Sequence, residues 1–144
     1  MLPIRVAQGS TAFFALAHTG GMLNTAFRDD KERVVIEALQ SYTFPIMGVE
    51  RSHHDFYQGM GFSLSLFLAF CVFLMQKLIP LIRENPATAR SLLMGLSLTF
   101  VVMAAFCVQW FFPAPLVMSA LTAAALAYTA WNLPTPKATA GVQG

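Results

Sequence analysis

The residues best suited to chemistry gather in one short stretch, positions 50–57. It holds two carboxylates, a guanidinium, a hydroxyl, two imidazoles and a phenol: Glu50, Arg51, Ser52, His53, His54, Asp55 and Tyr57. A further imidazole, His18, lies in a mostly apolar run near the start of the chain. Imidazoles and carboxylates transfer protons, and arginine binds phosphate or carboxylate through paired hydrogen bonds. The stretch therefore offers either acid–base chemistry or anion recognition.

Part of this stretch also has a structural interpretation. Ser52 and Asp55 stand three residues apart immediately before a long apolar run, which is the spacing of a helix capping box. In that motif each side chain accepts a hydrogen bond from the backbone N–H of the other residue, and the cap is worth about 1 kcal/mol. A cap would account for Ser52 and Asp55 without any catalytic role.

The composition is that of a membrane protein. Of 144 residues, 56% are hydrophobic and 11% charged, against roughly 25% charged in soluble domains. The net charge of +2 is small and dispersed, so we expect no nucleic-acid partner. Cys71 and Cys107 both lie inside apolar runs and form no metal or redox motif. We therefore assign neither a metal site nor a cofactor.

Apolar runs of spanning length predict an all-α membrane protein, a four-transmembrane-helix bundle forming a single domain over residues 1–133. The first run has a small-x-small pattern, Ala15-Leu16-Ala17, that also fits a signal peptide. Its purely apolar core is short for an export signal, so we expect it to be retained. The predicted spans are residues 4–23, 56–82, 89–112 and 115–133, followed by a flexible C-terminal tail over 134–144.

The loop between the first two spans, residues 24–55, is the one long polar segment. Asp29 or Asp30 can cap a short amphipathic helix at the membrane surface, and Pro45 ends it. Gly48 then permits a tight turn. The apolar stripe expected on that helix is Val35, Ala38, Leu39 and Tyr42.

Small residues recur at the start of the second span. Gly59 and Ser63 are four residues apart, as are Gly61 and Ser65. Such spacing lets two membrane helices approach closely, so we predict a packing role for Gly59, Gly61 and Ser63.

Positive charges predict the orientation. The N-terminus, the second loop and the tail share one side in a four-span topology, and they carry Arg5, Lys77, Arg83, Arg90 and Lys137. The positive-inside rule therefore places both termini in the cytoplasm and the loop 24–55 outside.

Several motifs resemble those of a largely uncharacterised group of small four-span bacterial membrane proteins. The group shares a His-Thr-x-Gly motif and a Met-Gly-x-x-Arg-Ser/Thr-x-x-Asp-Phe-Tyr/Phe-x-Gly-Phe-Gly motif. This chain departs from them at Met60 and at His53-His54, where aromatic residues are more usual. The resemblance implies an address in the bacterial inner membrane and no particular chemistry. It rests on His18-Thr19-Gly20-Gly21, Met47-Gly48, Arg51-Ser52 and the run from Asp55 to Phe62.

Three functional hypotheses follow. The first is a membrane protein that binds a lipophilic or anionic-headgroup ligand or serves as an accessory subunit, a role compatible with a homo-oligomer or a larger membrane complex. Its binding residues would be Glu50, Arg51, Ser52, His53 and His54. The second is an acid–base enzyme, of isomerase or cyclase type, acting on a lipophilic substrate, with His18 or Asp55 moving the proton and Arg51 and Tyr57 holding an oxygen. The third is a haem or metal protein that uses His18 with His53 or His54. We prefer binding or accessory function, with a membrane lipid or lipophilic small molecule as the partner.

Overall fold

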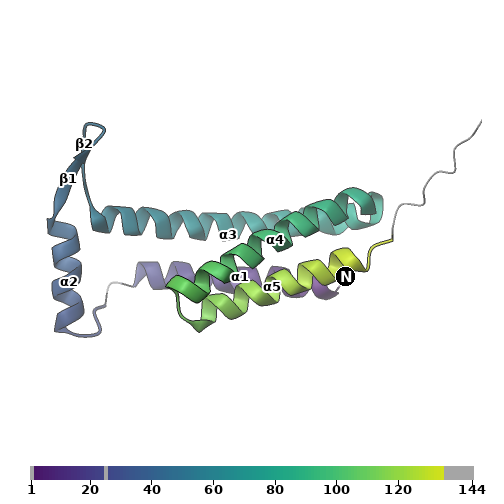
Figure 1. Cartoon of the computed structure of the whole chain (residues 1–144), viewed down its shortest axis with the longest axis horizontal. Coiled ribbons are helices and arrows are strands. Elements are labelled where there is room, and N and C mark those ends of the chain that lie inside the picture. Colours follow the sequence, from purple (N-terminus) through teal and green to yellow (C-terminus); the bar gives the residue numbers. More distant parts are fainter. Residues whose placement is uncertain (1, 25, 135–144) are drawn as a thin grey trace, which may run out of the picture. The chain divides into compact units, whose positions relative to one another are not determined.

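The computed structural model describes residues 2–24 and 26–134. Within these residues the chain is mostly helical, as the sequence predicts, with one short β-hairpin (Figure 1). The predicted tail lies, except for Pro134, outside the described residues. The elements are α1 (Leu2–Leu23), α2 (Asp30–Ser41), β1 (Thr43–Ile46), β2 (Val49–Ser52), α3 (His53–Glu84), α4 (Pro86–Trp110) and α5 (Pro113–Trp131).

Three of the described helices are long and apolar enough to cross a membrane: α3, α4 and α5, with 32, 25 and 19 residues. On α4, Leu98, Val101 and Phe106 are more than half exposed, as expected for side chains that face lipid. The first predicted span also forms a helix, α1, of 22 residues. Its polar residues Gln8 and Thr11 lower its apolar character, and it is not among the three, so the count of four spans stays a prediction.

The described chain forms two compact units. The first unit comprises the described residues up to Phe14 and those from Ala69 onward, and the second unit comprises the described residues from Ala15 to Leu68. Helices α1 and α3 are each divided between the two units.

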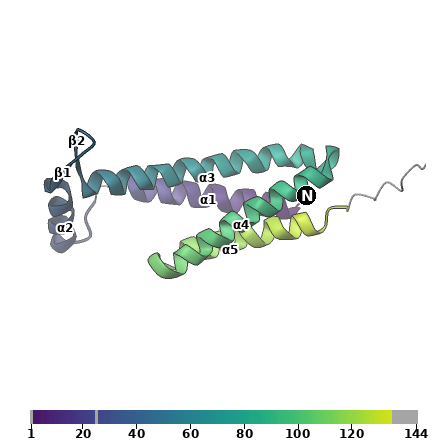
Figure 2. The ribbon, with the colours of Figure 1, turned by 45° about the horizontal axis from the view of Figure 1, so that its top comes forward.

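In the first unit, α4 and α5 run side by side (Figures 1 and 2). Each helix buries residues three or four positions apart, which is the spacing of one helical face. The hydroxyl of Ser97 donates to the carbonyl of Ala123, 2.8 Å away, so a polar contact joins the two helices inside an otherwise apolar interface. The buried residues at this interface include Leu93, Ser97, Phe100, Thr122, Ala123 and Leu126.

The first part of α1 joins the same unit through polar side chains. The hydroxyls of Thr11 and Thr122 lie 3.3 Å apart. Near its start, Arg5 Nη1 donates to the side-chain oxygens of Gln8 and Gln76, each at 2.8 Å. Hydrogen bonds of this kind hold helices together where exclusion from water contributes little.

The second unit contains the predicted short helix, now α2. Asp29 is its N-cap, and Asp29 Oδ1 accepts a hydrogen bond of 2.8 Å from the N–H of Glu32. The predicted apolar stripe is largely exposed, as a stripe that faces a membrane surface would be, so its contact with a membrane stays a prediction. Val35 is 56% exposed, and the face turned toward the rest of the unit carries Glu32, Ile36 and Gln40 instead.

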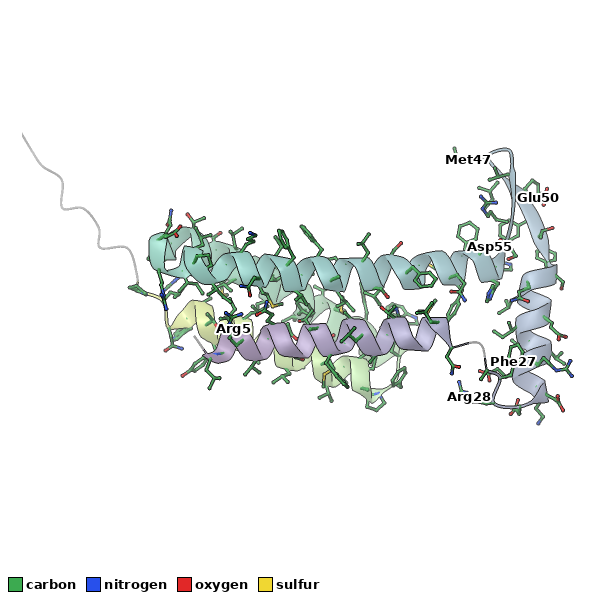
Figure 3. The ribbon with its side chains drawn as sticks, turned by 180° about the vertical axis from the view of Figure 1, so that it is seen from behind. Arg5, Phe27, Arg28, Met47, Glu50 and Asp55 are labelled. Atoms are coloured by element: carbon green, nitrogen blue, oxygen red, sulfur yellow. The ribbon has the colours of Figure 1, made fainter. Side chains whose placement is uncertain are left out.

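A hairpin that the sequence did not predict links α2 to α3 (Figure 3). Strands β1 and β2 pair antiparallel, from Thr43 opposite Ser52 to Ile46 opposite Val49. Both turn residues have positive φ, 50° at Met47 and 86° at Gly48. Paired positive φ values are typical of the two-residue turns that match the twist of a hairpin.

Candidate ligand-binding site

The start of α3 is fixed by a capping box. The N–H of Ser52 donates to Asp55 Oδ2 at 2.8 Å, and the N–H of Asp55 donates to the Ser52 hydroxyl at 3.1 Å. Asp55 comes immediately before the span predicted over residues 56–82. The hydrogen bond from the Ser52 N–H, aided by the Ser52 hydroxyl, holds the pKa of Asp55 below its usual range. Both hydrogen bonds of the predicted cap are therefore present, and they engage Ser52 and Asp55 structurally.

The two adjacent histidines have different surroundings. The His53 ring is stacked on Tyr42, with centroids 5.8 Å apart, and is tilted against Phe44 at 4.9 Å. Phe44 in turn stacks on Phe56 at 6.0 Å. His53 is thus part of an aromatic cluster that packs the hairpin against the first turn of α3, whereas His54 lines a pocket.

His18 makes a helix–helix contact within the second unit. Its Nε2 lies 3.0 Å from the carbonyl oxygen of Gly61. A carbonyl can only accept, so His18 carries a hydrogen on Nε2 and donates it. The next residue of α1, Thr19, places its Oγ1 2.9 Å from the Oγ of Ser65, one turn beyond Gly61 on α3. These contacts join the end of α1 to the early turns of α3.

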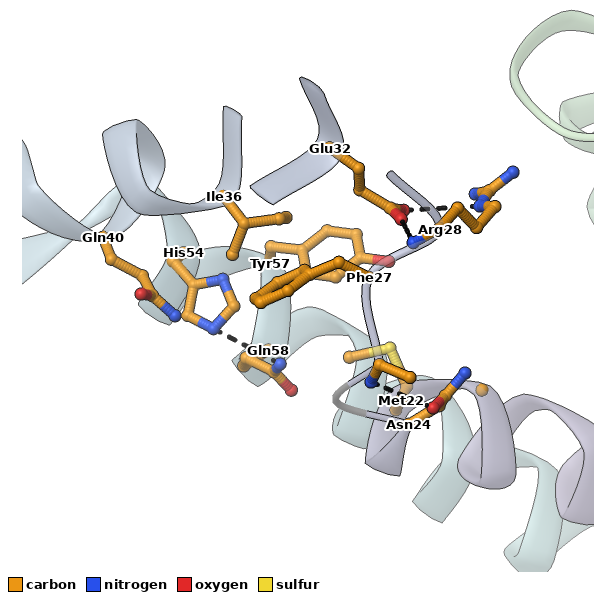
Figure 4. Close-up of a pocket in the computed structure, with 12 residues that line it drawn as sticks. Met22, Asn24, Phe27, Arg28, Glu32, Ile36, Gln40, His54, Tyr57 and Gln58 are labelled. Atoms are coloured by element: carbon orange, nitrogen blue, oxygen red, sulfur yellow. Dashed lines mark hydrogen bonds and ion pairs between the residues drawn. The ribbon is translucent and has the colours of Figure 1, made fainter. Parts of the chain in front are cut away.

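A pocket of about 440 Å³ opens in the second unit (Figure 4). The end of α1, linker residues 24 and 26–28, the inner face of α2 and the first turns of α3 form its walls. Its volume falls in the range of about 300–1,000 Å³ that is usual for small-molecule sites. The larger apolar side chains of its wall are those of Met22, Phe27, Ile36 and Tyr57, and the neutral polar part includes Asn24, Gln40, His54 and Gln58.

The charged residues that line this pocket neutralise each other. Arg28 Nε lies 3.4 Å from Glu32 Oε1, and the backbone N–H of Arg28 donates to Glu32 Oε2. The side chain of Arg28 is 90% exposed, so it reaches outward from the pocket rim. The pair closes the linker onto α2 and leaves the pocket without net charge.

His54, which lines the pocket, has a buried ring nitrogen with an unmet hydrogen bond. Its Nε2 lies 3.4 Å from the amide nitrogen of Gln58 (Figure 4). Its Nδ1 is buried and has no hydrogen-bond partner in the part of the chain that the structure describes. The ring also stacks loosely on Tyr57, with centroids 6.4 Å apart.

Arg51 lies beside a separate, more open groove of the same unit. The groove is lined by Arg51, Asp55, Phe56, Gly59, Met60 and Ser63. Arg51 Nη1 donates to the carbonyl of its neighbour Glu50 at 2.7 Å. Glu50 itself is exposed on β2 and lines neither hollow.

The predicted site residues are therefore distributed over several places in the second unit. His54 and Tyr57 line the pocket, Arg51 and Asp55 line the groove, and His53 belongs to the aromatic cluster. Sequence reasoning missed the pocket residues of α1, the linker and α2. The signal available for them was the spacing of Glu32, Ile36 and Gln40, which repeats every four residues and so marks one helical face.

Among residues 2–24 and 26–134, no group of three or more His, Cys, Asp or Glu side chains gathers as a metal site would require. Comparison of the chain with protein-family models, with curated proteins and with solved structures finds no match.

Proposed function

We propose that this chain is a four-span protein of the bacterial inner membrane that binds a lipophilic small molecule or lipid in the pocket of the second unit. The observation that carries the proposal is the mixed lining of that pocket. Met22, Phe27, Ile36 and Tyr57 offer an apolar surface, while His54 and Gln58, on either side of Tyr57 in α3, offer polar atoms. Binding sites for small molecules typically combine a mostly apolar lining with a few placed polar groups.

The proposed topology adds α1 to the three apolar helices. A helix of 22 residues is about 33 Å long at 1.5 Å per residue, enough for a hydrocarbon core of about 30 Å. The basic residues of the short loops then favour cytoplasmic termini, as the sequence indicates. In that topology the pocket lies at the outer membrane surface, where a ligand can enter from the lipid.

The observed contacts favour binding over the haem alternative. His18 Nε2 is already engaged with the Gly61 carbonyl, and the His53 ring contacts the rings of Tyr42 and Phe44. Ligation of an iron by these two residues would require both sets of contacts to be broken. His54 and Tyr57 keep the acid–base alternative open, because both line the pocket.

A matched pair of substitutions on α2 tests the proposal. Ile36 lines the pocket, while its neighbour Val35 is 56% exposed. Ile36→Trp fills the pocket and should remove lipophilic molecules that copurify with the detergent-extracted protein, as measured by native mass spectrometry. Val35→Trp adds the same bulk outside the pocket and should leave the bound species unchanged. Equal binding by the two variants would contradict the proposal.

A further inference from the structure

The hydrogen-bonding state of His54 follows from its neighbour. Gln58 approaches His54 Nε2 with its amide nitrogen, at 3.4 Å. An amide nitrogen carries two hydrogens and has no lone pair to share, so Gln58 donates and His54 Nε2 accepts. A neutral imidazole has a single N–H, which in this arrangement lies on Nδ1.

That N–H is left without a partner inside the pocket wall. Nδ1 is buried, and within residues 2–24 and 26–134 no acceptor lies in hydrogen-bond range of it. A buried donor without an acceptor costs folding free energy, because it has given up its hydrogen bonds to water. Because Nδ1 has almost no accessible surface, an acceptor atom on a bound ligand would restore the missing hydrogen bond once a neighbouring side chain moves to admit it.

The charges around the pocket specify what kind of acceptor fits. The charged lining residues are Arg28 and Glu32, which form an ion pair with each other. A phosphate or carboxylate would therefore enter without an uncompensated cation to balance it, next to the Glu32 carboxylate. An uncharged oxygen meets no such repulsion, and the aromatic side chains of Phe27 and Tyr57 favour an apolar body around it.

We infer that the ligand is an uncharged lipophile with a carbonyl oxygen, which accepts a hydrogen bond from His54 Nδ1. This inference rests on the proposed function, since it specifies the ligand of the same pocket. Two sources supply such an oxygen in a membrane: the ring of a quinone and the ester of a diacylglycerol.

Four probes with the full-length protein in one detergent test the inference. Decylubiquinone and dioleoylglycerol carry carbonyl oxygens, decylbenzene carries no acceptor, and decyl phosphate carries a charge. We expect at least one carbonyl probe to bind about tenfold more tightly than decylbenzene, the effect of one buried hydrogen bond. Which of the two carbonyl probes binds more tightly distinguishes the quinone from the ester source.

Two substitutions at His54 complete the test. His54→Phe keeps a ring but removes the donor, and should bring the carbonyl probes and decylbenzene to equal affinity. His54→Asn keeps an N–H donor near the position of Nδ1 and should retain part of the preference. The melting temperature of each variant shows that it remains folded.

The possible failures are distinguishable. Equal affinity of the unmodified protein for decylbenzene and both carbonyl probes overturns the inference but leaves the proposed function intact, as does tightest binding of decyl phosphate. Retention of the full preference by His54→Phe overturns the inference in the same way. Absence of binding for all four probes, or binding that Ile36→Trp does not weaken, overturns the proposed function itself.

Discussion

His18 donates a hydrogen bond from Nε2 to the backbone carbonyl of Gly61, 3.0 Å away, and so joins α1 to α3 in the second unit. Backbone carbonyls inside a helix normally accept only from the N–H four residues later, so this one accepts a second hydrogen bond. The contact gives His18 a structural role at the end of α1. Substitutions at His18 can therefore distinguish a role in stability from a role in ligand binding.

We expect His18→Ala to lower the free energy of unfolding by about 1 kcal/mol, because the Gly61 contact is lost. His18→Gln keeps a donor near the position of Nε2 and should recover part of that loss. Unfolding by sodium dodecyl sulfate in mixed micelles measures the free energy of unfolding of both variants. Should His18→Ala be as stable as the unmodified protein while losing ligand binding, the structural assignment would be wrong.

The capping box predicts a second stability effect, at the start of α3. Ser52 is buried, and its hydroxyl accepts from the N–H of Asp55. Ser52→Ala should therefore destabilise the protein by roughly 1 kcal/mol, as usual for the loss of an N-cap. Ser63→Ala is the matched control, because the Ser63 hydroxyl bonds only within its own helix, to the carbonyl of Gly59. Equal effects of the two substitutions would contradict the role of the cap.

The carboxylate of the same cap predicts a dependence on pH. The folded-state pKa of Asp55 is lowered from 3.8 by the hydrogen bond from the Ser52 N–H. A lowered folded pKa means that the carboxylate stabilises the fold above the unfolded pKa, and that this stabilisation disappears as pH falls through the folded pKa. The stability difference between the unmodified protein and Asp55→Asn should thus shrink between about pH 6 and about pH 3. A stability difference that is constant over this pH range would contradict the stabilising role of the Asp55 carboxylate.

The helices could be predicted because the sequence marks their ends chemically. Pro86 and Pro113 stand at the first positions of α4 and α5, and Asn85 caps α4 through Thr88. The predicted ends of the long helices accordingly differ from the observed ends by at most three residues. The hairpin could not be predicted, because its strands have four residues each, too few to show the alternation of apolar and polar residues that marks a strand.

The pocket was less predictable than the helices. Closeness in sequence suggested that residues 50–57 act together, but successive positions on a helix point about 100° apart. His54 and Asp55 therefore line different hollows of the same unit. Met22 and Phe27 carry no chemical signal of their own, and only the folded linker brings them to the pocket wall.

The hairpin turn offers a stabilising substitution. Met47 has a φ of 50°, a left-handed conformation that costs energy for most side chains, and its side chain is fully exposed. Asparagine tolerates this conformation better, and Asn-Gly is a preferred pair for such turns. Met47→Asn should raise the free energy of unfolding by up to about 1 kcal/mol, whereas the β-branched side chain of Met47→Val should lower it. The opposite order would show that Met47 stabilises the fold through its side chain.

The close approach of α1 and α3 predicts that two glycines of α3 respond differently to the same change. A Cβ on Gly59 would meet no heavy atom within 4 Å, whereas a Cβ on Gly61 would overlap the thioether end of Met22. Gly59→Ala should therefore stabilise the protein by up to about 1 kcal/mol through helix propensity, and Gly61→Ala should gain less or lose stability.

Because Met22 lines the pocket, Gly61→Ala should also weaken binding of the carbonyl probes. Adding Met22→Ala to Gly61→Ala should relieve the overlap and restore stability. Equal stabilisation by the two glycine substitutions, with unchanged binding, would contradict this account of the helix contact.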